Sequence, residues 1–316
     1  MAAEPEDHPP ASTLLPRPLL LAGPTAVGKS AISLLLAERL GGEIVSVDSM
    51  QVYRGMDIGT AKPSPADRAR VPHHVIDVVE LTESFDVVRF VQLAHRAVAD
   101  IQSRGRVPIL CGGTGLYFKA FLHGVGEATP ADAALRALLD ATPLPELLRE
   151  LAERDPVTHE RIKHQDFRRV RRAIEVIRLT GKPFSAQRSN WDHATRSAHE
   201  AASFLGFARS PVDLHQRVSA RVDAMFGQGL VAETEQLLQR GLAQNETAMQ
   251  ALGYRQIVEH LRGERSLADT IELVKLRTRQ YAKRQMTWFR RQLQLTWINL
   301  EPQSSAEAAV EAIARL

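Results

Sequence analysis

The feature that most constrains the fold of this chain is the octapeptide GPTAVGKS, which runs from Gly23 to Ser30. It matches the phosphate-loop pattern, in which successive backbone N–H groups and the N-terminus of the following helix surround phosphate oxygens. The apolar run from Arg17 to Ala22 is typical of a buried strand, and Lys29 to Leu40 has the pattern of a helix. Strand, loop and helix therefore occur in the order that the motif requires.

Strand and helix patterns continue to alternate after the loop. We expect strands at residues 43–47, 74–78 and 107–111 and a long helix at residues 86–103. This alternation predicts an α/β fold, with a parallel sheet that is covered by helices on both faces. Because ligands of such sheets bind at the carboxyl ends of the strands, Gly23, Asp48 and Gly112 should converge there.

The alternation stops near Ala128, and from Pro130 to Asn190 only helical patterns are found. A strand pattern returns at residues 202–208, and helical patterns follow at 212–240, 253–261 and 267–293. We therefore predict a P-loop NTPase-like core of residues 17–127 and 200–316, with an all-helical insertion at residues 128–199. The Pro-rich residues 1–16 are expected to form a disordered tail.

Composition bears on where the protein resides. The longest apolar run, around Leu19 to Ala22, is far shorter than the roughly 20 residues of a membrane-spanning helix, so we expect no membrane association. The N-terminal stretch lacks the basic start and apolar centre of a signal peptide. The single cysteine, Cys111, fits a reducing compartment. We expect a cytoplasmic protein, which we take to be a monomer.

The net charge of +3 is small, but the basic residues are clustered. Arg161 to Arg172 contains one acid among many bases, and Lys275 to Gln294 contains no acid. Such segments are typical of surfaces that contact a phosphate backbone. A solvated cationic helix is the alternative for the second segment, although Trp288 and Phe289 among the bases favour a packed face.

The motif predicts how the side chains and the backbone of the phosphate loop bind phosphate. Lys29 would contact the outer phosphate and Ser30 would help to hold Mg²⁺. The remaining cradle is formed by Gly23, Pro24, Thr25, Ala26, Val27 and Gly28. The pattern alone leaves open which phosphates bind, and it fits a kinase or another NTPase equally well.

Asp48 follows the strand predicted at residues 43–47 and should face the loop. From the residues alone, its carboxylate could bind Mg²⁺ through water, cap a helix or accept a proton. The strand that ends at Cys111 runs into GGTGLY instead of an aspartate that would bind the metal, which argues against a motor ATPase. Glycines in that turn would let a substrate approach the backbone closely.

Taken together, these segments resemble one family, the tRNA dimethylallyltransferases, and the resemblance spans residues 17–297. DSMQVY at Asp48 to Tyr53 matches the family element without departure, and MDIGTAKP follows it at Met56 to Pro63. Gly112 to Tyr117 matches the GGTxLY element. QALGYR at Gln250 to Arg255 resembles xxxGYR, and RQYAKRQMTWFR at Arg279 to Arg290 resembles RQxAKRQxTWxR.

DFRRVRRAIEV at Asp166 to Val176 is similar to the basic tRNA-contact segment of the family, usually DPQRIxRALEV. Arg168 stands where glutamine is usual, so we expect contact with the phosphate backbone there instead of direct base readout. Arg217 is expected to be an additional clamp on the diphosphate. The chain carries no C-terminal zinc-finger extension like that of animal and fungal relatives, which favours the bacterial form.

The resemblance implies transfer of a dimethylallyl group from dimethylallyl diphosphate to the exocyclic amine of the adenosine 3′-adjacent to the anticodon, in tRNAs that read U-initial codons. Asp48 would be the general base, with Thr114 and Lys29 as further catalytic residues. Mg²⁺, held by Ser30 and through water by Asp48, would be the cofactor, and ATP would be dispensable. Contacts with the tRNA anticodon stem-loop are implied at Asp48, Ser49, Met50, Gln51, Thr114, Arg136, Arg168, Arg169, Val170, Arg171, Arg172, Gln250, Gly253, Tyr254, Arg255, Lys283, Arg284, Gln285 and Arg290.

Three other functions stay open. An adenylate isopentenyltransferase, which makes free cytokinin, is closest in chemistry but would not need the segment from Arg279 to Arg290. A P-loop small-molecule kinase would not need two basic helical segments. An RNA-binding ATPase would need a strand-end aspartate after Leu110, which the sequence lacks.

Overall fold

The structure is a computed structural model that describes residues 16–125, 129–187 and 203–315. Two compact units are formed, one by the described parts of Met1–Lys119 and His199–Leu316 and the other by those of Ala120–Ala198. The tail predicted at residues 1–16 lies almost entirely outside the described residues, as does the end of the predicted insertion from residue 188 onward.

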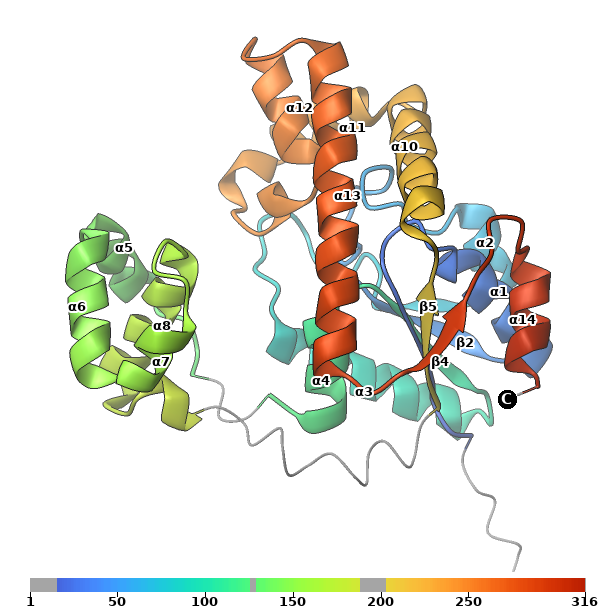
Figure 1. Cartoon of the computed structure of the whole chain (residues 1–316), viewed down its shortest axis with the longest axis horizontal. Helices are drawn as coiled ribbons and strands as arrows, with labels where there is room; N and C mark the ends of the chain where they lie inside the picture. The colour runs from blue at the N-terminus through green and yellow to red at the C-terminus, as the bar shows by residue number, and fades with distance from the viewer. Residues whose placement is uncertain (1–15, 126–128, 188–202, 316) are drawn as a thin grey trace, which may run out of the picture. The chain divides into compact units, whose positions relative to one another are not determined.

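The larger unit is built on a six-stranded sheet with the order β3-β2-β4-β1-β5-β6, in which every strand pair is parallel (Figure 1). The predicted α/β class is therefore confirmed. The strands are β1 (Leu19–Ala22), β2 (Glu43–Val47), β3 (His73–His74), β4 (Pro108–Gly112), β5 (Ser203–Ala208) and β6 (Thr296–Asn299).

The strand predicted at residues 74–78 is wrong in its extent, since β3 ends at His74. Val75 and Asp77 adopt positive φ angles of 61° and 55°, a left-handed conformation that no strand contains. The sequence also gave no indication of β6 or of the last helix.

Helices cover both faces of the sheet (Figure 1). The long helix predicted at residues 86–103 is confirmed as α3, within one residue at its start. The helices assigned to this unit are α1 (Lys29–Leu40), α2 (Pro65–Arg70), α3 (Val87–Ser103), α4 (Gly115–His123, which runs past the division at residue 119), α10 (Pro211–Gly227), α11 (Leu230–Gln239), α12 (Tyr254–Leu261), α13 (Leu267–Gln292) and α14 (Ala306–Ile313).

The core follows from the alternation of side chains along the strands. Leu19 and Leu21 face a cluster that includes residues of α1 and α14, while Leu20 between them is fully buried outside that cluster. Burying an aliphatic side chain of this size stabilises the fold by about 1.5–3 kcal/mol. A second cluster, with Val218, Val222 and Val274, joins α10 to α13. Ala26 of the phosphate loop packs against this second cluster, which places α10 and α13 beside the loop.

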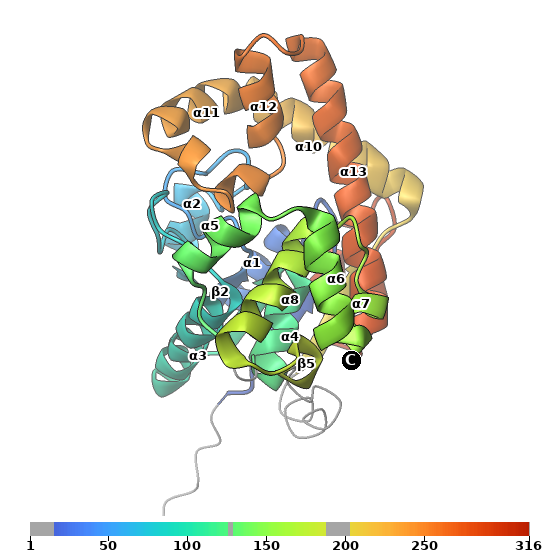
Figure 2. The same ribbon diagram turned by 90° about the vertical axis from the view of Figure 1, so that its left-hand side faces the viewer.

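The smaller unit contains only helices within its described residues, as the fold class predicted. They are α5 (Ala133–Ala141), α6 (Leu144–Arg154), α7 (Pro156–Arg161), α8 (Phe167–Thr180) and a 3₁₀ turn at Phe184–Gln187 (Figure 2). Their core is formed by Leu139, Leu147, Leu151, Val170, Ala173, Ile174 and Ile177. None of the described helices of either unit combines the length and the hydropathy that a bilayer span demands.

Candidate active site

The phosphate loop joins β1 to α1 through a backbone that requires its glycines. Gly23 and Gly28 have φ angles of 156° and 111°, and a Cβ at Gly23 would lie 2.8 Å from the carbonyl oxygen of Phe207. No side chain caps the N-terminus of α1. The first N–H groups of this helix therefore face the loop, which is the arrangement that binds phosphate oxygens.

Lys29 points back into the loop, where its Nζ donates a hydrogen bond of 2.7 Å to the carbonyl oxygen of Pro24. Burial is the main cause that lowers the pKa of this ammonium to about 8. The positive charge of Arg221 acts in the same direction, while Cys111 and Asp48 oppose the shift. A bound diphosphate would restore a countercharge beside the ammonium. Lys29 thus lies within the loop in an environment that favours an anionic ligand, and its contact with the outer phosphate stays a prediction.

Two arginines hold the loop from β5 and α10. The Nε groups of Arg209 and Arg217 donate hydrogen bonds of 2.9 Å to the carbonyl oxygens of Val27 and Ala26. Both guanidinium groups lie less than 4 Å from the position that a Cβ would take at Gly28. The structure therefore brings the predicted clamp Arg217 to the loop. Arg209 was missed, because its contacts are distant in sequence.

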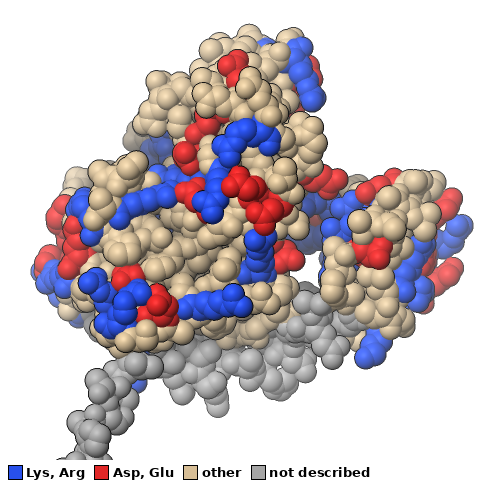
Figure 3. Space-filling view, turned by 180° about the vertical axis from the view of Figure 1, so that it is seen from behind, with Lys and Arg blue, Asp and Glu red and all other residues tan. Residues whose placement is uncertain are grey.

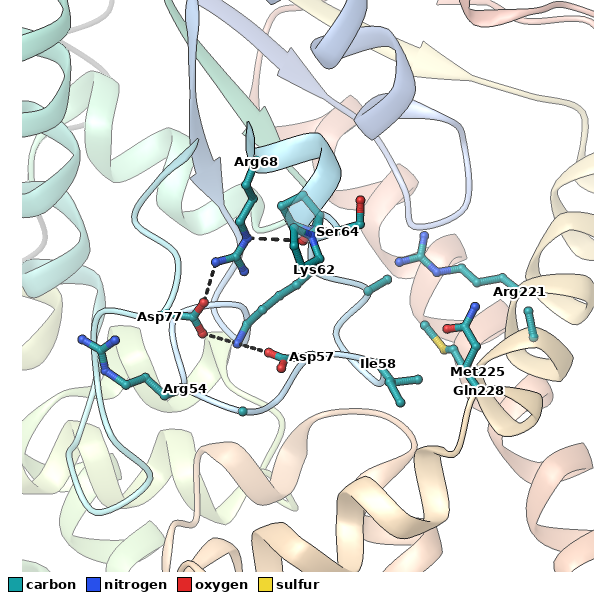
Figure 4. A pocket seen from close by; sticks show the side chains of 15 residues that line it. Arg54, Asp57, Ile58, Lys62, Ser64, Arg68, Asp77, Arg221, Met225 and Gln228 are labelled. Atoms are coloured by element: carbon teal, nitrogen blue, oxygen red, sulfur yellow. Dashed lines mark hydrogen bonds and ion pairs between the residues drawn. The ribbon is translucent and has the colours of Figure 1, made fainter. Parts of the chain in front are cut away.

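Arg221, one helical turn after Arg217, was also missed. Its side chain lines a pocket of about 780 Å³ between the segment 54–68 and α10 (Figure 4). Burial lowers the pKa of Arg221, and the charge of Asp48 opposes this shift. Because Arg221 also affects the pKa of Lys29, its charge reaches both the phosphate loop and Asp48. The spacing of four residues on one helix was the signal that could have identified it.

Asp48 and Thr114 meet at the carboxyl ends of β2 and β4. Asp48 Oδ1 accepts hydrogen bonds from the N–H groups of Met50 at 2.8 Å and Gln51 at 3.2 Å. Thr114 Oγ1 accepts from the N–H of Ser49 at 3.2 Å. These contacts fix the turn after β2, and both bonds to Asp48 that are found among the described residues reach Oδ1. Oδ2 is therefore left for a proton, a water or an ion.

Gln51 is occupied within the loop. Its Oε1 accepts from Ser46 Oγ at 2.8 Å, and its Nε2 donates to the carbonyl oxygens of Thr60 and Ala61, both at 3.2 Å. The predicted contact of this amide with a base stays a prediction. In the structure the amide connects the turn at Asp48 to the segment that follows it.

Gln285 of α13 bridges the phosphate loop and the glycine turn after β4. Its Oε1 accepts from the N–H of Thr25 and its Nε2 donates to the carbonyl oxygen of Gly113, both at 2.9 Å. A Cβ at Gly113 would lie 2.4 Å from Gln285 Nε2, and one at Gly115 would lie 2.1 Å from the ring of Trp288. The two glycines therefore allow α13 to approach. Gln285 bridges the two turns, and its predicted contact with tRNA stays a prediction.

The other residues of the larger unit that were predicted to contact tRNA divide into exposed and buried ones. Lys283, Arg284 and Arg290 are exposed on α13, and the first two line a groove of about 520 Å³ on that helix. Tyr254 is fully buried and donates to Glu233 at 2.7 Å. Arg255 is exposed and pairs with Glu259. Gly253 is the N-cap residue of α12, and Gln250 donates to the carbonyl oxygen of Glu246.

In the smaller unit, the acid Glu175 neutralises two of the predicted arginines. Arg136 contacts this buried carboxylate at 2.8 Å and Arg172 at 2.7 Å. Although burial raises the pKa of Glu175, the hydrogen bonds from both arginines hold it below its usual value. Arg171 pairs with Asp140 at 2.6 Å, and Val170 is fully buried. Arg168 and Arg169 remain exposed on α8.

The donors near the loop fit Mg²⁺ better than a transition metal. Among the described residues, no group of three or more His, Cys, Asp or Glu side chains is placed to bind a metal. Ser30 is exposed at the start of α1, and Asp48 keeps one carboxylate oxygen available. A hydroxyl and a carboxylate oxygen suit a hard cation that retains most of its water ligands.

Comparison with known proteins now bears on this geometry. A family model described as IPP transferase matches residues 51–292. The chain belongs to the IPP transferase family. A tRNA dimethylallyltransferase of Geobacter metallireducens is 47% identical over 288 residues, which cover 89% of this chain and 92% of that protein. One of Geobacillus kaustophilus is 42% identical over 94% of both chains.

Solved structures agree with the family assignment. The full-length tRNA isopentenylpyrophosphate transferase of Bacillus halodurans is 37% identical, with a TM-score of 0.69 over 95% of this chain and 94% of that one. A eukaryotic dimethylallyltransferase acting on tRNA is 29% identical, with a TM-score of 0.75 over 95% of this chain and 77% of that one. The family membership and the P-loop NTPase-like fold class that the sequence predicted are thus confirmed.

Proposed function

We propose that this chain is a tRNA dimethylallyltransferase that acts on the adenosine 3′-adjacent to the anticodon of tRNAs that read U-initial codons. The observation that carries the proposal is the common position of the phosphate loop, Asp48 and Thr114 at one edge of the sheet, with Lys29 and Arg217 beside them. One relative described above is named a tRNA dimethylallyltransferase, and a similar solved structure is of a eukaryotic dimethylallyltransferase acting on tRNA.

The chemistry follows from this arrangement. The exocyclic nitrogen of adenosine attacks the allylic carbon of dimethylallyl diphosphate, the bond from that carbon to oxygen breaks, and diphosphate leaves. Asp48 accepts the proton that the amine loses, a contribution of typically 10²–10⁴-fold. Thr114, which is 3.2 Å from the N–H of Ser49, keeps the turn of Asp48 against β4.

The leaving diphosphate gains negative charge as the bond to carbon breaks, and the cradle is built to stabilise that charge. Lys29, the backbone N–H groups of the loop and Arg217 supply the positive charge, and removing one such donor costs about 3–4 kcal/mol. Mg²⁺, held by Ser30 and through water by Asp48, would supply additional charge stabilisation for the diphosphate. No ATP is consumed, because the diphosphate is itself the leaving group.

The adenosine must leave its stack before it can reach Asp48, at a cost of a few kcal/mol. Contacts with tRNA phosphates offset that cost. The exposed cations of α13 support this part of the proposal. By contrast, Lys, Arg, Asp and Glu side chains are interspersed on the face of the larger unit shown in Figure 3.

An adenylate isopentenyltransferase is the alternative closest in chemistry. It would not need a helix such as α13, whose exposed cations form no salt bridge with the described residues, so tRNA has the stronger support. A P-loop small-molecule kinase has even less use for that surface. We further propose a cytoplasmic monomer, for which light scattering should give a mass near the 35.0 kDa of one chain.

The experiment that tests this function is incubation of the enzyme with unmodified tRNA, Mg²⁺ and dimethylallyl diphosphate, followed by mass spectrometry of the nucleosides. We expect a single dimethylallyl group on the adenosine next to the anticodon. Modification of free AMP in preference to tRNA would replace the proposal with the adenylate enzyme.

Asp48→Asn tests the assigned base. We expect tRNA affinity within about threefold of the wild type and a single-turnover rate lower by at least about 10², because the amide keeps the shape but cannot accept the proton. A variant that turns over at nearly the normal rate would remove Asp48 as the base.

A further inference from the structure

Glu233 of α11 binds a segment to which the proposed chemistry assigns no role. Its Oε2 accepts hydrogen bonds from the N–H groups of Asp57 at 3.1 Å and Ile58 at 2.7 Å, and its Oε1 accepts from the N–H of Gly59 at 3.2 Å. The phenol of Tyr254 adds a fourth hydrogen bond at 2.7 Å. One carboxylate thus holds three successive backbone N–H groups.

Close packing around these contacts also restricts which residue can stand at position 59. A Cβ at Gly59 would lie 2.5 Å from the ring of Tyr254, so only glycine lets the segment reach Glu233. Burial, together with the charge of Glu233, raises the pKa of the Tyr254 phenol. The phenol therefore stays protonated and remains a donor. Together α11 and α12 fix one position of the segment at residues 57–59.

Gln51 connects this segment to Asp48, so the position of the segment affects the position of the Asp48 carboxylate. The carbonyl oxygens of Thr60 and Ala61 accept both hydrogen bonds from Gln51 Nε2. The N–H of Gln51 in turn donates to Asp48 Oδ1 at 3.2 Å. Three sets of hydrogen bonds therefore connect Glu233 with the carboxylate that we assign as the base.

The same segment forms one wall of the pocket that Arg221 lines. Ile58 of the segment lines this pocket together with Arg221 and Met225 of α10 (Figure 4). Lys62 pairs with Asp57 at 2.8 Å and with Asp77 at 2.5 Å on the other side of the segment. A displacement of residues 57–61 would therefore alter both the turn of Asp48 and this wall.

We propose that Glu233 is a positioning residue for prenyl transfer. It fixes residues 57–61 so that Gln51 holds the Asp48 carboxylate in its reactive orientation. Glu233 itself touches neither substrate. The inference rests on the proposed function in taking Asp48 as the base, but the chain of contacts from Glu233 to Asp48 stands independently of that assignment.

The test compares Glu233→Gln with Glu235→Gln, which removes the same charge from an exposed position on the same helix. The amide of Glu233→Gln keeps the shape but turns an N–H₂ group toward backbone donors. We expect its single-turnover rate at saturating substrates to fall at least tenfold, with dimethylallyl diphosphate affinity within about threefold of the wild type. Glu235→Gln should match the wild type in both.

Gln51→Ala, alone and combined with Glu233→Gln, tests whether Glu233 acts on Asp48 through Gln51 or only by keeping this part of the protein ordered. If Glu233 acts through Gln51, the double variant should lose no more rate than the worse single variant. Fully additive losses, an unchanged rate in Glu233→Gln, or an affinity for dimethylallyl diphosphate that falls in parallel with the rate would overturn the proposal. Should Glu233→Gln not fold, Tyr254→Phe removes one donor to the carboxylate and should lower the rate in the same direction, whereas an unchanged rate there would also overturn it.

Hydrogen exchange gives a readout that needs no activity. In Glu233→Gln the amides of residues 57–59 and those of Met50 and Gln51 should exchange faster, while those of the phosphate loop should not change. Unchanged exchange at Met50 and Gln51 would refute the relay even in an active enzyme. If exchange in Glu233→Gln rises in this way but the wild-type enzyme fails to modify tRNA, the proposed function is refuted and the relay is left intact.

Discussion

Helices α8 and α13 both carry a run of arginines, yet the structure gives the two runs different surroundings. On α8, Arg171 pairs with Asp140, and Arg172 pairs with the buried Glu175. On α13, only Lys275 forms salt bridges within the part of the chain that the structure describes. The cations without such a partner there are Arg277, Arg279, Lys283, Arg284, Arg290 and Arg291.

The difference shows that a basic run in a sequence is not the same as a basic surface. An arginine that already pairs with an acid releases few counterions when a phosphate arrives, because its charge is partly neutralised beforehand. Cations without acidic partners contribute the full effect to binding. We therefore expect α13 to account for more of the salt dependence of tRNA binding than α8.

The largest effect on binding should come from α13. Replacing both Lys283 and Arg284 by alanine should reduce the slope of log affinity against log salt by roughly 1.4–1.8, which corresponds to two phosphate contacts. Filter binding or fluorescence anisotropy across a salt series measures this slope. A slope equal to that of the wild type would show that this face of α13 is only solvated.

Replacing both Arg168 and Arg169 on α8 should have about half that effect. Arg169 lies 3.3 Å from Asp166, which offsets part of its charge, so we expect the slope to fall by roughly 0.7–0.9. Affinity for dimethylallyl diphosphate should not change. A loss larger than that of the α13 variant would reverse the comparison.

Arg136→Ala should affect stability more than binding. It removes one of the two arginines that satisfy the buried Glu175, so the free energy of unfolding should fall by roughly 2 kcal/mol. The salt slope should change by less than about 0.3. Arg149→Ala, an exposed arginine of α6, is the matched control in denaturant unfolding. If Arg136→Ala instead reduced the slope of log affinity against log salt by roughly 0.7–0.9, as expected for one lost phosphate contact, the structural role would be contradicted.

The pH dependence of diphosphate binding should be the smallest effect. Because burial lowers the pKa of Lys29 to about 8, the free enzyme loses this positive charge as the pH rises through that value. Affinity for dimethylallyl diphosphate, measured by calorimetry, should therefore weaken between about pH 7 and pH 9. Lys29→Arg keeps its charge throughout this range, so its affinity should show no such inflection.

Local patterns were sufficient to predict β1, β2, β4, α1 and α3, but not the extent of β3 or the helices α2 and α4. The spacing of Gly23, Gly28, Lys29 and Ser30 fixes the loop conformation, and the apolar runs fix β1, β2 and β4. Their parallel order then places Asp48 beside the loop without further information.

The parts of the site that were not predicted depend on contacts between residues that lie far apart in the sequence. Gln285 binds Thr25 across 260 positions, and Glu233 binds Ile58 across 175. A sequence shows that α13 carries a glutamine, but not that its amide faces the loop. The acid that neutralises Arg136 lies 39 positions away on another helix, so the sequence around Arg136 could not reveal the pair.

The measurement that tests the central claim most directly asks what the phosphate loop holds. We predict complete tRNA modification in a nucleotide-free mixture of enzyme, Mg²⁺, tRNA and dimethylallyl diphosphate, with inorganic pyrophosphate competing against the prenyl substrate. Lys29→Ala should lose at least about a hundredfold in rate, because it removes a donor to the leaving group. A requirement for ATP hydrolysis, or prenyl transfer that is unaffected in Lys29→Ala, would contradict the account.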